Sequence, residues 1–398
     1  MRLYRAPRMF DGSGASMVED AAVLIGNDGR IIEAGQAGDV SARGAEVVAC
    51  EGTIMPGLID CHVHLCLSGE ADPVSQIRSE PLARIAARAT AAMLRYIGAG
   101  ITTVRDLGGV GNIPIELGRM VAEGRLLGPR VIAAGQMIGA TGGHCHFMAR
   151  EADGCDEVTK ATREQIRAGA DCIKVMATGG MITPGSQPGA QQMSIEELSA
   201  AVRAAHRLGR HVAAHAQGKS GIDDCVEAGI DTIEHGIWLE EKSARLMKEK
   251  GTYLVPTFSA ALGIISGRGK GVPDETIDKM QVGLEAQRSS FAIAREIGVS
   301  VVAGSDAGTP LNPHGTLAGE VRALIENGLD VLDALAACTG RAARAIGLDE
   351  VGVLEPGRIA DMIEIDGDPT EDPWALSLVR RVVQAGVESR SPLRPVSA

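Results

Sequence analysis

Two histidines separated by one residue, His62 and His64, close a mostly apolar segment of the chain. Successive side chains of a β-strand point to opposite faces, so residues two apart share a face. Both imidazoles can therefore bind one metal ion, although two polar residues that merely cap a strand would give the same pattern. The metal interpretation depends on whether other ligand-type residues fall at comparable positions.

Four more side chains of this kind lie in or directly after apolar, β-branched segments. His215, His235 and Asp306 each follow such a segment, and Lys174 lies inside one. A buried ammonium group is costly. For Lys174 the residues leave open a side chain that reaches solvent, an ion pair, and a lysine carbamylated by carbon dioxide, whose carboxylate would suit zinc.

Strand-like segments alternate with helix-like segments through the middle of the chain. Residues 83–97, 194–208 and 275–297 have helical spacing, and Ser194 with Glu197 predicts a capping box. Buried strands that alternate with helices indicate an α/β fold, a parallel (β/α)8 barrel with its active site at the carboxyl ends of the strands. The expected strands span 53–59, 101–104, 130–133, 172–175, 211–214, 231–233, 253–255 and 300–303.

The two ends of the chain have the alternating pattern of short exposed strands, with a hairpin-turn signal at residues 27–29. Neither end can bury a core alone, so we expect residues 1–52 and 355–390 to form one small β-sandwich domain. Residues 53–354 would form the barrel, and residues 391–398 a flexible tail.

Composition excludes several classes of protein. With 45% hydrophobic and 23% charged residues, the chain is neither disordered nor a membrane protein. A net charge of −12 argues against nucleic-acid and anionic-membrane partners. The scattered cysteines and the absence of a secretory signal predict a reduced, cytoplasmic protein.

Seven motifs, each weak alone, occur in order across the chain. Together they are similar to the amidohydrolase superfamily, in particular its imidazolonepropionase-like branch of metal-dependent dipeptidases and carboxypeptidases (Xaa-Pro dipeptidase-like). The resemblance covers roughly residues 1–390. The motifs are Pro56-Gly57-Leu58-Ile59-Asp60-Cys61-His62-Val63-His64, Gly98-Ala99-Gly100-Ile101-Thr102-Thr103-Val104-Arg105-Asp106, Thr141-Gly142-Gly143-His144, Ile173-Lys174-Val175, Ala214-His215-Ala216, Ile233-Glu234-His235-Gly236 and Gly304-Ser305-Asp306-Ala307-Gly308. In addition, Leu354-Glu355-Pro356-Gly357-Arg358-Ile359-Ala360-Asp361 matches the family's return to the small β domain.

The resemblance implies a site for two divalent metal ions, with zinc the expected metal. His62, His64 and Asp306 would hold the more buried ion, and His215 and His235 the second. Carbamylated Lys174, formed with carbon dioxide or bicarbonate, and a hydroxide would bridge the two. Asp306 would also accept the proton of the attacking hydroxide and pass it to the leaving nitrogen.

Three residues are expected to contact substrate. The resemblance gives His144 a role in stabilising the oxyanion or binding the substrate. Gln217 stands where carboxypeptidase-like relatives often carry an aromatic residue or a histidine. Arg105 could meet a substrate carboxylate, and a bracing pair with Asp106 is at least as plausible. Roles in the pocket for His146 and His314 stay open.

The predicted reaction is hydrolysis of a small-molecule amide, a dipeptide or an N-acyl amino acid. Alternatives are a xenobiotic amide or phenylurea, ochratoxin-type amides included, and a cyclic amide or lactone. A non-catalytic binding protein is disfavoured because all six ligand positions carry suitable residue types. A homo-oligomer is compatible with the sequence, and the native metal stays open.

Overall fold

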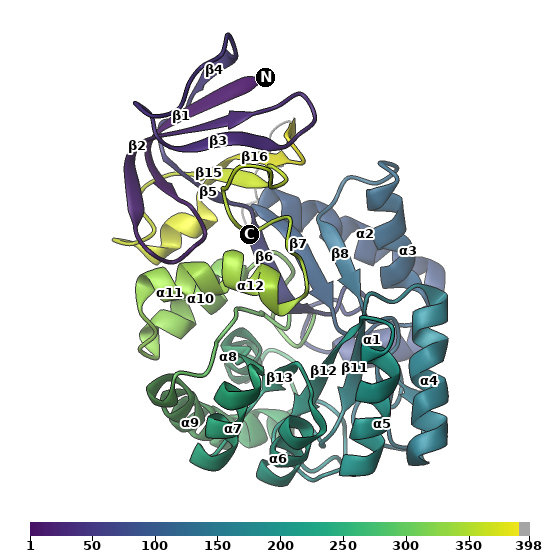
Figure 1. Cartoon of the computed structure of the whole chain (residues 1–398). Coiled ribbons are helices and arrows are strands. Elements are labelled where there is room, and N and C mark those ends of the chain that lie inside the picture. Colours follow the sequence, from purple (N-terminus) through teal and green to yellow (C-terminus); the bar gives the residue numbers. More distant parts are fainter. Residues whose placement is uncertain (390–398) are drawn as a thin grey trace.

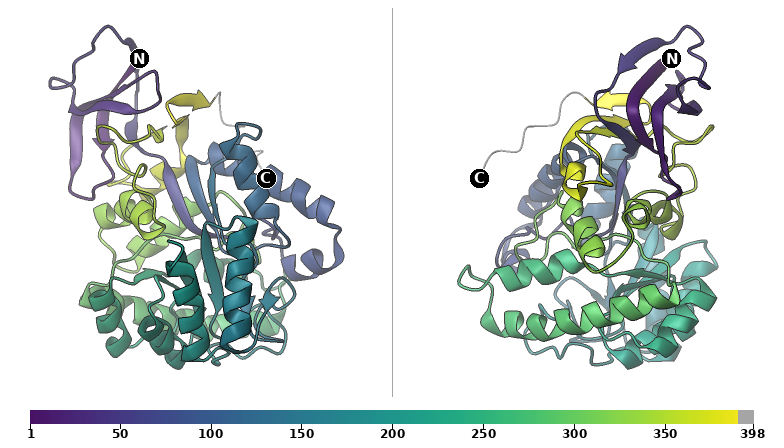
Figure 2. Two further views of the ribbon diagram at one scale, coloured as in Figure 1. Left: turned by 45° about the vertical axis from the view of Figure 1, so that its right-hand side comes forward. Right: turned by 90° about the vertical axis from the view of Figure 1, so that its left-hand side faces the viewer.

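The computed structural model describes residues 1–389, so the tail expected over 391–398 lies outside the described residues. A sheet built from both ends of the chain lies beside a larger body of strands and helices (Figure 1). Figure 2 shows the strands from the two ends of the chain in the same part of the molecule in two further views. No helix over residues 1–389 is long and apolar enough to cross a membrane.

The sheet from the chain ends contains eight strands of mixed direction. Its order is β17-β16-β15-β5-β1-β2-β3, and β4 pairs with β1 beside β5. The strands expected to form a sandwich belong to one hydrogen-bonded sheet with a branch. The strands are β1 (Arg2–Phe10), β2 (Met17–Ile25), β3 (Ile31–Gln36), β4 (Glu46–Ala49), β5 (Thr53–Pro56), β15 (Met362–Ile365), β16 (Val379–Gln384) and β17 (Val387–Ser389).

The larger body has the parallel strands of a TIM-barrel-like α/β fold. They form a three-stranded sheet, β6-β7-β8, and a six-stranded sheet, β10-β9-β11-β12-β13-β14. The strands are β6 (Leu58–Val63), β7 (Ile101–Asp106), β8 (Arg130–Ala133), β9 (Ile138–Gly139), β10 (Arg150–Glu151), β11 (Cys172–Met176), β12 (His211–Ala216), β13 (Thr232–His235) and β14 (Tyr253–Val255).

Two expected strands differ from the prediction. The segment 53–59 is divided, because β5 pairs with β1 and β15 whereas β6 pairs with β7. Gly57 separates the two and packs against Thr102, where an added Cβ would lie 2.2 Å from the Thr102 hydroxyl. The segment 300–303 is not a regular strand. Single parallel bridges join Val301 to β14 and Ala307 to β6, which places the segment between these two strands.

Helices pack around the parallel strands, and the three predicted from spacing are present. The capping box at α5 is also formed, because Ser194 accepts from the Glu197 amide and Glu197 accepts from the Ser194 amide at 2.8 Å. The helices are α1 (Pro73–Ser79), α2 (Leu82–Gly98), α3 (Ile113–Ala122), α4 (Gly154–Ala168), α5 (Ile195–His206), α6 (Lys219–Ala228), α7 (Glu241–Lys250), α8 (Phe258–Ser266), α9 (Asp274–Ile297), α10 (Leu317–Glu326), α11 (Val331–Ala337), α12 (Gly340–Ala345) and the short 3₁₀ helix η1 (Pro373–Ser377).

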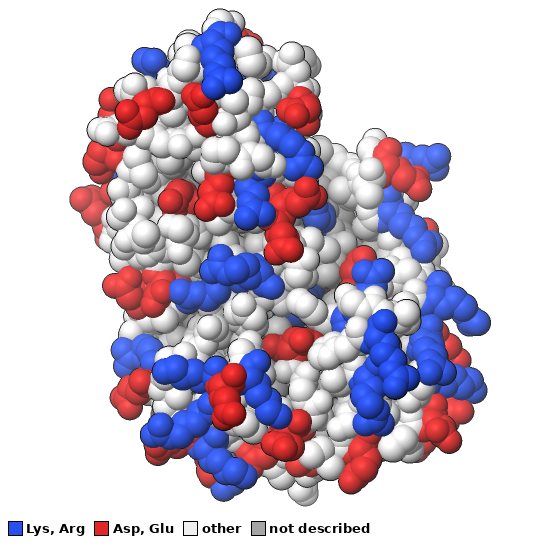
Figure 3. Space-filling model, viewed as in Figure 1, with Lys and Arg blue, Asp and Glu red and all other residues white. Residues whose placement is uncertain are grey.

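The main hydrophobic core lies between the parallel strands and the helices, and a separate core lies within the terminal sheet. An ion pair between the partly buried Arg130 of β8 and the buried Asp361, 2.8 Å apart, joins the two parts. Acidic and basic side chains are interspersed on the face drawn in Figure 3.

Candidate metal and catalytic site

Side chains from five separate segments converge at the carboxyl ends of the parallel strands. They line a cavity with an empty volume of about 590 Å³, including its open mouth. The strands supply His62 and His64 from β6 and its end, Lys174 from β11, His215 from β12 and His235 from β13, and Asp306 follows the eighth segment. The sequence-predicted ligands are thus brought together, as expected if each ends a barrel strand.

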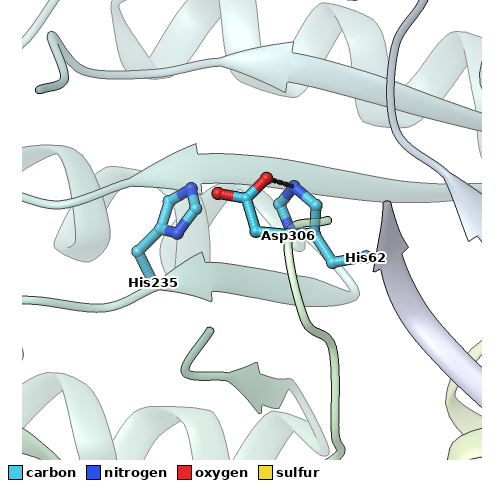
Figure 4. A group of neighbouring side chains, drawn as sticks. All are labelled: His62, His235 and Asp306. Carbon is cyan, nitrogen blue, oxygen red and sulfur yellow. Dashed lines mark ion pairs between the residues drawn. The ribbon is translucent and has the colours of Figure 1, made fainter. Parts of the chain in front are cut away.

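Asp306 lies between the imidazoles of His62 and His235 (Figure 4). Its Oδ1 is 3.4 Å from Nε2 of His62 and 3.3 Å from Nε2 of His64. One ligand atom from each of His62, His235 and Asp306 lies within 4.8 Å of the others, close enough to share one ion. His235 and Asp306 have positive φ angles of 73° and 55°, a strained conformation that is characteristic of functional sites.

The protonation states suit metal ligands. Burial would raise the pKa of Asp306, but His62 and His64 hold that pKa below its ordinary range, so the carboxylate is charged. Burial lowers the pKa of His62 well below its ordinary value and the pKa of His235 to about 4. Nε2 of His62 and Oδ1 of Asp306 are buried without a hydrogen-bond partner. A divalent cation is the kind of group that satisfies such atoms, so the residues fit a metal.

The Nδ1 atoms of three of these histidines have acceptors of their own. Nδ1 of His62 lies 2.7 Å from Glu234, that of His64 is 2.9 Å from the Gly108 carbonyl, and that of His235 is 2.7 Å from the Thr257 hydroxyl. Each contact leaves Nε2 for a metal, the usual arrangement of histidine ligands. His215 instead has Nε2 3.3 Å from the Gly179 carbonyl, and its ring lies 4.7 Å from the His235 ring.

Lys174 is buried among these groups and lines the cavity. Burial lowers the pKa of its amine to about 8. Within residues 1–389, no carboxylate oxygen lies within 4.0 Å of the amine, so the ion-pair alternative is not formed. The lowered pKa increases the fraction of Lys174 that is a neutral amine, and the neutral amine is the form that reacts with carbon dioxide.

His144 lies in the loop after β9 and contacts the cavity. Its ring is 4.6 Å from that of His215, and burial lowers its pKa to about 3. The loop between β11 and α5 holds it, because the His144 amide donates to Gln192 Oε1 at 2.9 Å and the next amide donates to Thr183 at 3.0 Å. The ring also packs on Gly180, where an added Cβ would lie 2.4 Å from Nε2.

The other expected contacts fall in different places. Gln217 lines the cavity, and its Oε1 is buried without a partner. His146 is exposed and does not line the cavity. His314 is buried away from it, where its ring nitrogens lie 2.8 Å from the Tyr96 hydroxyl and 2.9 Å from the Leu67 carbonyl. His314 is therefore a structural residue.

Arg105 does not line the cavity. Its side chain is 1% exposed and lies beneath the site, with Nη2 3.0 Å from Glu234. Asp106 is not its partner, because that carboxylate accepts from the amides of Leu65 and Gly108. We therefore assign Arg105 neither the substrate contact nor the bracing pair expected from the sequence. The strand alternation that places Thr102 and Val104 on one face directs Arg105 inward.

Several residues of the site had no role in the sequence analysis. Glu234, like Lys174, is a charged residue within an apolar segment, and this pattern could have identified it. Only the adjacent His235 was interpreted as a functional residue. Thr257 and Gln287 also line the cavity, but no sequence motif predicts their presence there. The apolar side of the cavity comes mostly from loops and helices distant in sequence: Met137, Met176, Met181, Ile182, Ile237, Ala260, Ala261, Ile264 and Met280.

Comparison with known proteins agrees with this geometry. Residues 53–388 match the amidohydrolase family, and the chain belongs to that family. It is 32% identical to an ochratoxinase of Aspergillus niger over 80% of this chain and 71% of that protein. It is 26% identical to an imidazolonepropionase of Ectopseudomonas mendocina, over 95% of each chain. The structure of a Xaa-Pro dipeptidase with methionine bound in its active site superimposes with a TM-score of 0.89 at 30% identity, over 98% of this chain and 99% of that one.

Proposed function

We propose that this amidohydrolase is a metal-dependent enzyme that hydrolyses a carbon–nitrogen amide bond of a small molecule with an apolar acyl group and an amino acid as leaving group. The observation that carries the proposal is the buried cluster of His62, His235 and Asp306, which lines the cavity and contains the unpartnered Nε2 of His62 and Oδ1 of Asp306. Such a cluster at the carboxyl ends of parallel strands is where this fold performs its chemistry.

We assign the ligands to two metal ions. His62, His64 and Asp306 would hold the inner ion, His215 and His235 would hold the outer ion, and carbamylated Lys174 would contribute to both. Zinc fits these nitrogen and oxygen ligands, as do cobalt and manganese. When bound, such cations acidify a water molecule and polarise the carbonyl that is attacked.

Asp306 and His144 supply the proton transfers and the polar contacts of the reaction. Asp306 has a carboxylate oxygen free of hydrogen-bond donors, so it can accept a proton from the attacking water and return it to the leaving nitrogen. His144 is neutral near pH 7, and its Nδ1 is buried without a partner. It can therefore orient the substrate carbonyl or stabilise the negative charge that develops on that oxygen.

The substrate class follows from the cavity lining and from the relatives. Four methionines, with isoleucine and alanine side chains, form an apolar wall of the cavity that also holds the metal ligands. This wall fits an apolar acyl group, because apolar surface is removed from water on binding. The amino-acid leaving group is suggested by the similarity to a Xaa-Pro dipeptidase at 30% identity, whose structure holds methionine in the active site.

The test is a hydrolysis screen of zinc-loaded protein in the presence of bicarbonate. Dipeptides and N-acyl amino acids with apolar acyl groups would be compared with polar analogues, phenylureas, lactones and cyclic amides. We expect release of a free amino acid from apolar amides, detected by mass spectrometry. Turnover confined to ureas or ring substrates would retain the metal chemistry and refute the substrate class.

A second candidate is hydrolysis of an uncharged amide or urea. Apart from Lys174, no lysine or arginine lines the described cavity, so a substrate carboxylate has no cationic partner there. Gln217 and Gln287 each present a buried, unpartnered Oε1 instead. Each N-acyl amino acid should therefore be assayed beside its terminal amide. A higher kcat/KM for the amide would favour this candidate.

A further inference from the structure

A polar network crosses the interior of the barrel directly beneath the inner site. Its members, Arg105, Thr232 and Glu234, are at most 1% exposed. Branched apolar side chains usually fill the interior of such barrels, and Arg105 is the largest fully buried side chain of the described structure. The presence of charged residues at this depth therefore requires an explanation.

Each nitrogen of the Arg105 guanidinium and each oxygen of the Glu234 carboxylate has a partner, and the network ends at His62. The Arg105 guanidinium donates to the Cys61 carbonyl at 2.6 Å, to Thr232 at 3.1 Å and to Oε1 of Glu234 at 3.0 Å. Thr232 donates to the same oxygen at 2.5 Å. The other oxygen, Oε2, is left to His62, whose Nδ1 lies 2.7 Å away.

His62 is thereby distinguished from the other cavity histidines. The acceptors at His64 and His215 are backbone carbonyls, and the contact at His235 is a hydroxyl. Only His62 among these four donates to a carboxylate. A charged acceptor at Nδ1 fixes the tautomer with a free Nε2 and increases the electron density that Nε2 offers to a cation.

Stability alone does not account for the network. A buried ion pair is seldom more stabilising than apolar side chains of similar volume, because both charges lose their hydration. The orientation of His62 does account for it, since an apolar replacement would fill the space but leave Nδ1 unpaired.

We propose that Glu234 is a positioning residue that sets the metal affinity of the inner site through His62, and that Arg105 holds Glu234 in place for this task. The proposal rests on the metal site of the proposed function but not on any substrate. It predicts that a carboxylate oxygen held at Nδ1 of His62, rather than the space that the Glu234 side chain fills, controls the retention of one of the two ions.

The test is chelator competition on Glu234→Gln, a variant of nearly the same shape without the charge. Wild type and variant would be loaded with cobalt, titrated with a chelator and followed by visible absorption and metal analysis. We expect one metal equivalent to leave the variant at a chelator concentration about 10- to 100-fold lower than in wild type, with the second equivalent unchanged.

Asp361→Asn serves as a matched control, because it removes the charge of a buried carboxylate that pairs with the partly buried Arg130 away from the cavity. It should lower Tm of the metal-free protein and leave both metal affinities unchanged. Should Glu234→Gln fail to fold, Glu234→Asp serves instead, because its shorter side chain cannot reach both Arg105 and His62. Equal retention of both ions by the wild type and the Glu234 variant overturns the proposal. A wild type that binds no divalent metal overturns the proposed function instead.

Discussion

At the scale of single residues, the site combines groups whose charge is set by burial and by one another. Asp306 stays ionised beside the neutral imidazoles of His62 and His235, and Lys174 is an amine with a depressed pKa. A histidine that is neutral and a carboxylate that is charged are the forms that bind cations. The next two predictions test these residues directly.

Replacing Asp306 with Asn should reduce kcat about 10²- to 10⁴-fold, because the amide cannot accept the proton that the carboxylate takes up. Steady-state kinetics on the substrate found in the screen would measure the loss. Circular dichroism and the binding of a substrate analogue provide the control, since both should persist. A variant with near wild-type kcat would exclude Asp306 as the proton acceptor.

Carbamylation of Lys174 should be visible in the metal-loaded protein supplied with ¹³C-bicarbonate. A carbamate resonance is expected in the ¹³C spectrum of the wild type and should be absent from Lys174→Arg, whose guanidinium does not react in this way. Lys219→Arg is the control, because Lys219 is an exposed lysine paired with Glu240. A wild-type spectrum without the resonance would argue for an unmodified lysine.

At the scale of elements, loops and helix ends hold the residues that the strands present. The loop between β11 and α5 contacts the cavity through Met181 and Ile182, and it also holds His144 through Thr183 and Gln192. The ring of His144 and Gly180 are in direct contact. A change in this loop should therefore alter catalysis more than it alters stability.

Gly180→Ala tests this coupling. The added methyl group would lie 2.4 Å from Nε2 of His144, so the imidazole must move. We expect kcat/KM to fall about 10- to 100-fold, since small misplacements of catalytic groups have effects of that size, and Tm to change little. Gly319→Ala in α10 has open space around it and should leave both quantities unchanged. Equal kcat/KM values for the two variants would contradict the proposed role of the loop in positioning His144.

The first amides of α8 donate to the buried carboxylate of Glu320 on α10, at 3.0 and 2.7 Å. Burial raises the pKa of Glu320 to about 7, although these donors oppose the shift. The native state therefore keeps the proton at pH values where the unfolded chain has lost it. The stability that this group confers is complete below about pH 4.5 and is lost as the pH rises to about 7.

The expected loss is about 3 kcal/mol, from 1.36 kcal/mol per pKa unit. Urea unfolding of wild type and Glu320→Gln between pH 4.5 and 7.5 would measure it, because the variant lacks the titrating group. The stability difference between the two proteins should shift in favour of the variant as the pH rises. A difference independent of pH would show that Glu320 titrates normally.

At the scale of the whole molecule, the site joins segments from distant parts of the chain. The inner-site ligands come from β6 and from the segment after the eighth barrel position, more than two hundred residues later, and β13 adds His235. A ligand that binds only the folded arrangement stabilises it by mass action. Metal should therefore contribute to the stability of the barrel as well as to its chemistry.

Removal of metal by a chelator should lower Tm by several degrees, and zinc should restore it. A free metal concentration of 100 times Kd adds about 2.7 kcal/mol to the free energy of unfolding. Differential scanning calorimetry of chelated and zinc-loaded protein would measure the shift. Asp306→Asn, which lacks one ligand, should show a smaller shift. Identical transitions with and without zinc in the wild type would contradict a metal site in the barrel.

The sequence alone determined the class of fold and the candidate ligands. Strand and helix periodicity is local, and histidines, a lysine and an aspartate at the ends of apolar segments are visible without any long-range contact. The Ser194 capping box and the His62–His64 pair were predicted for this reason, and the structure brings all six candidate ligands to one cavity.

Tertiary structure decided what the sequence left open, because those features depend on which distant segments meet. Residues 53–59 have one continuous apolar pattern, yet β5 pairs with strands from both ends of the chain, and this divides the segment. Arg105 could point to the cavity or to the interior, and only its contact with Glu234, 129 positions away, settles the choice. The apolar wall likewise comes from loops and helices whose packing no local pattern specifies.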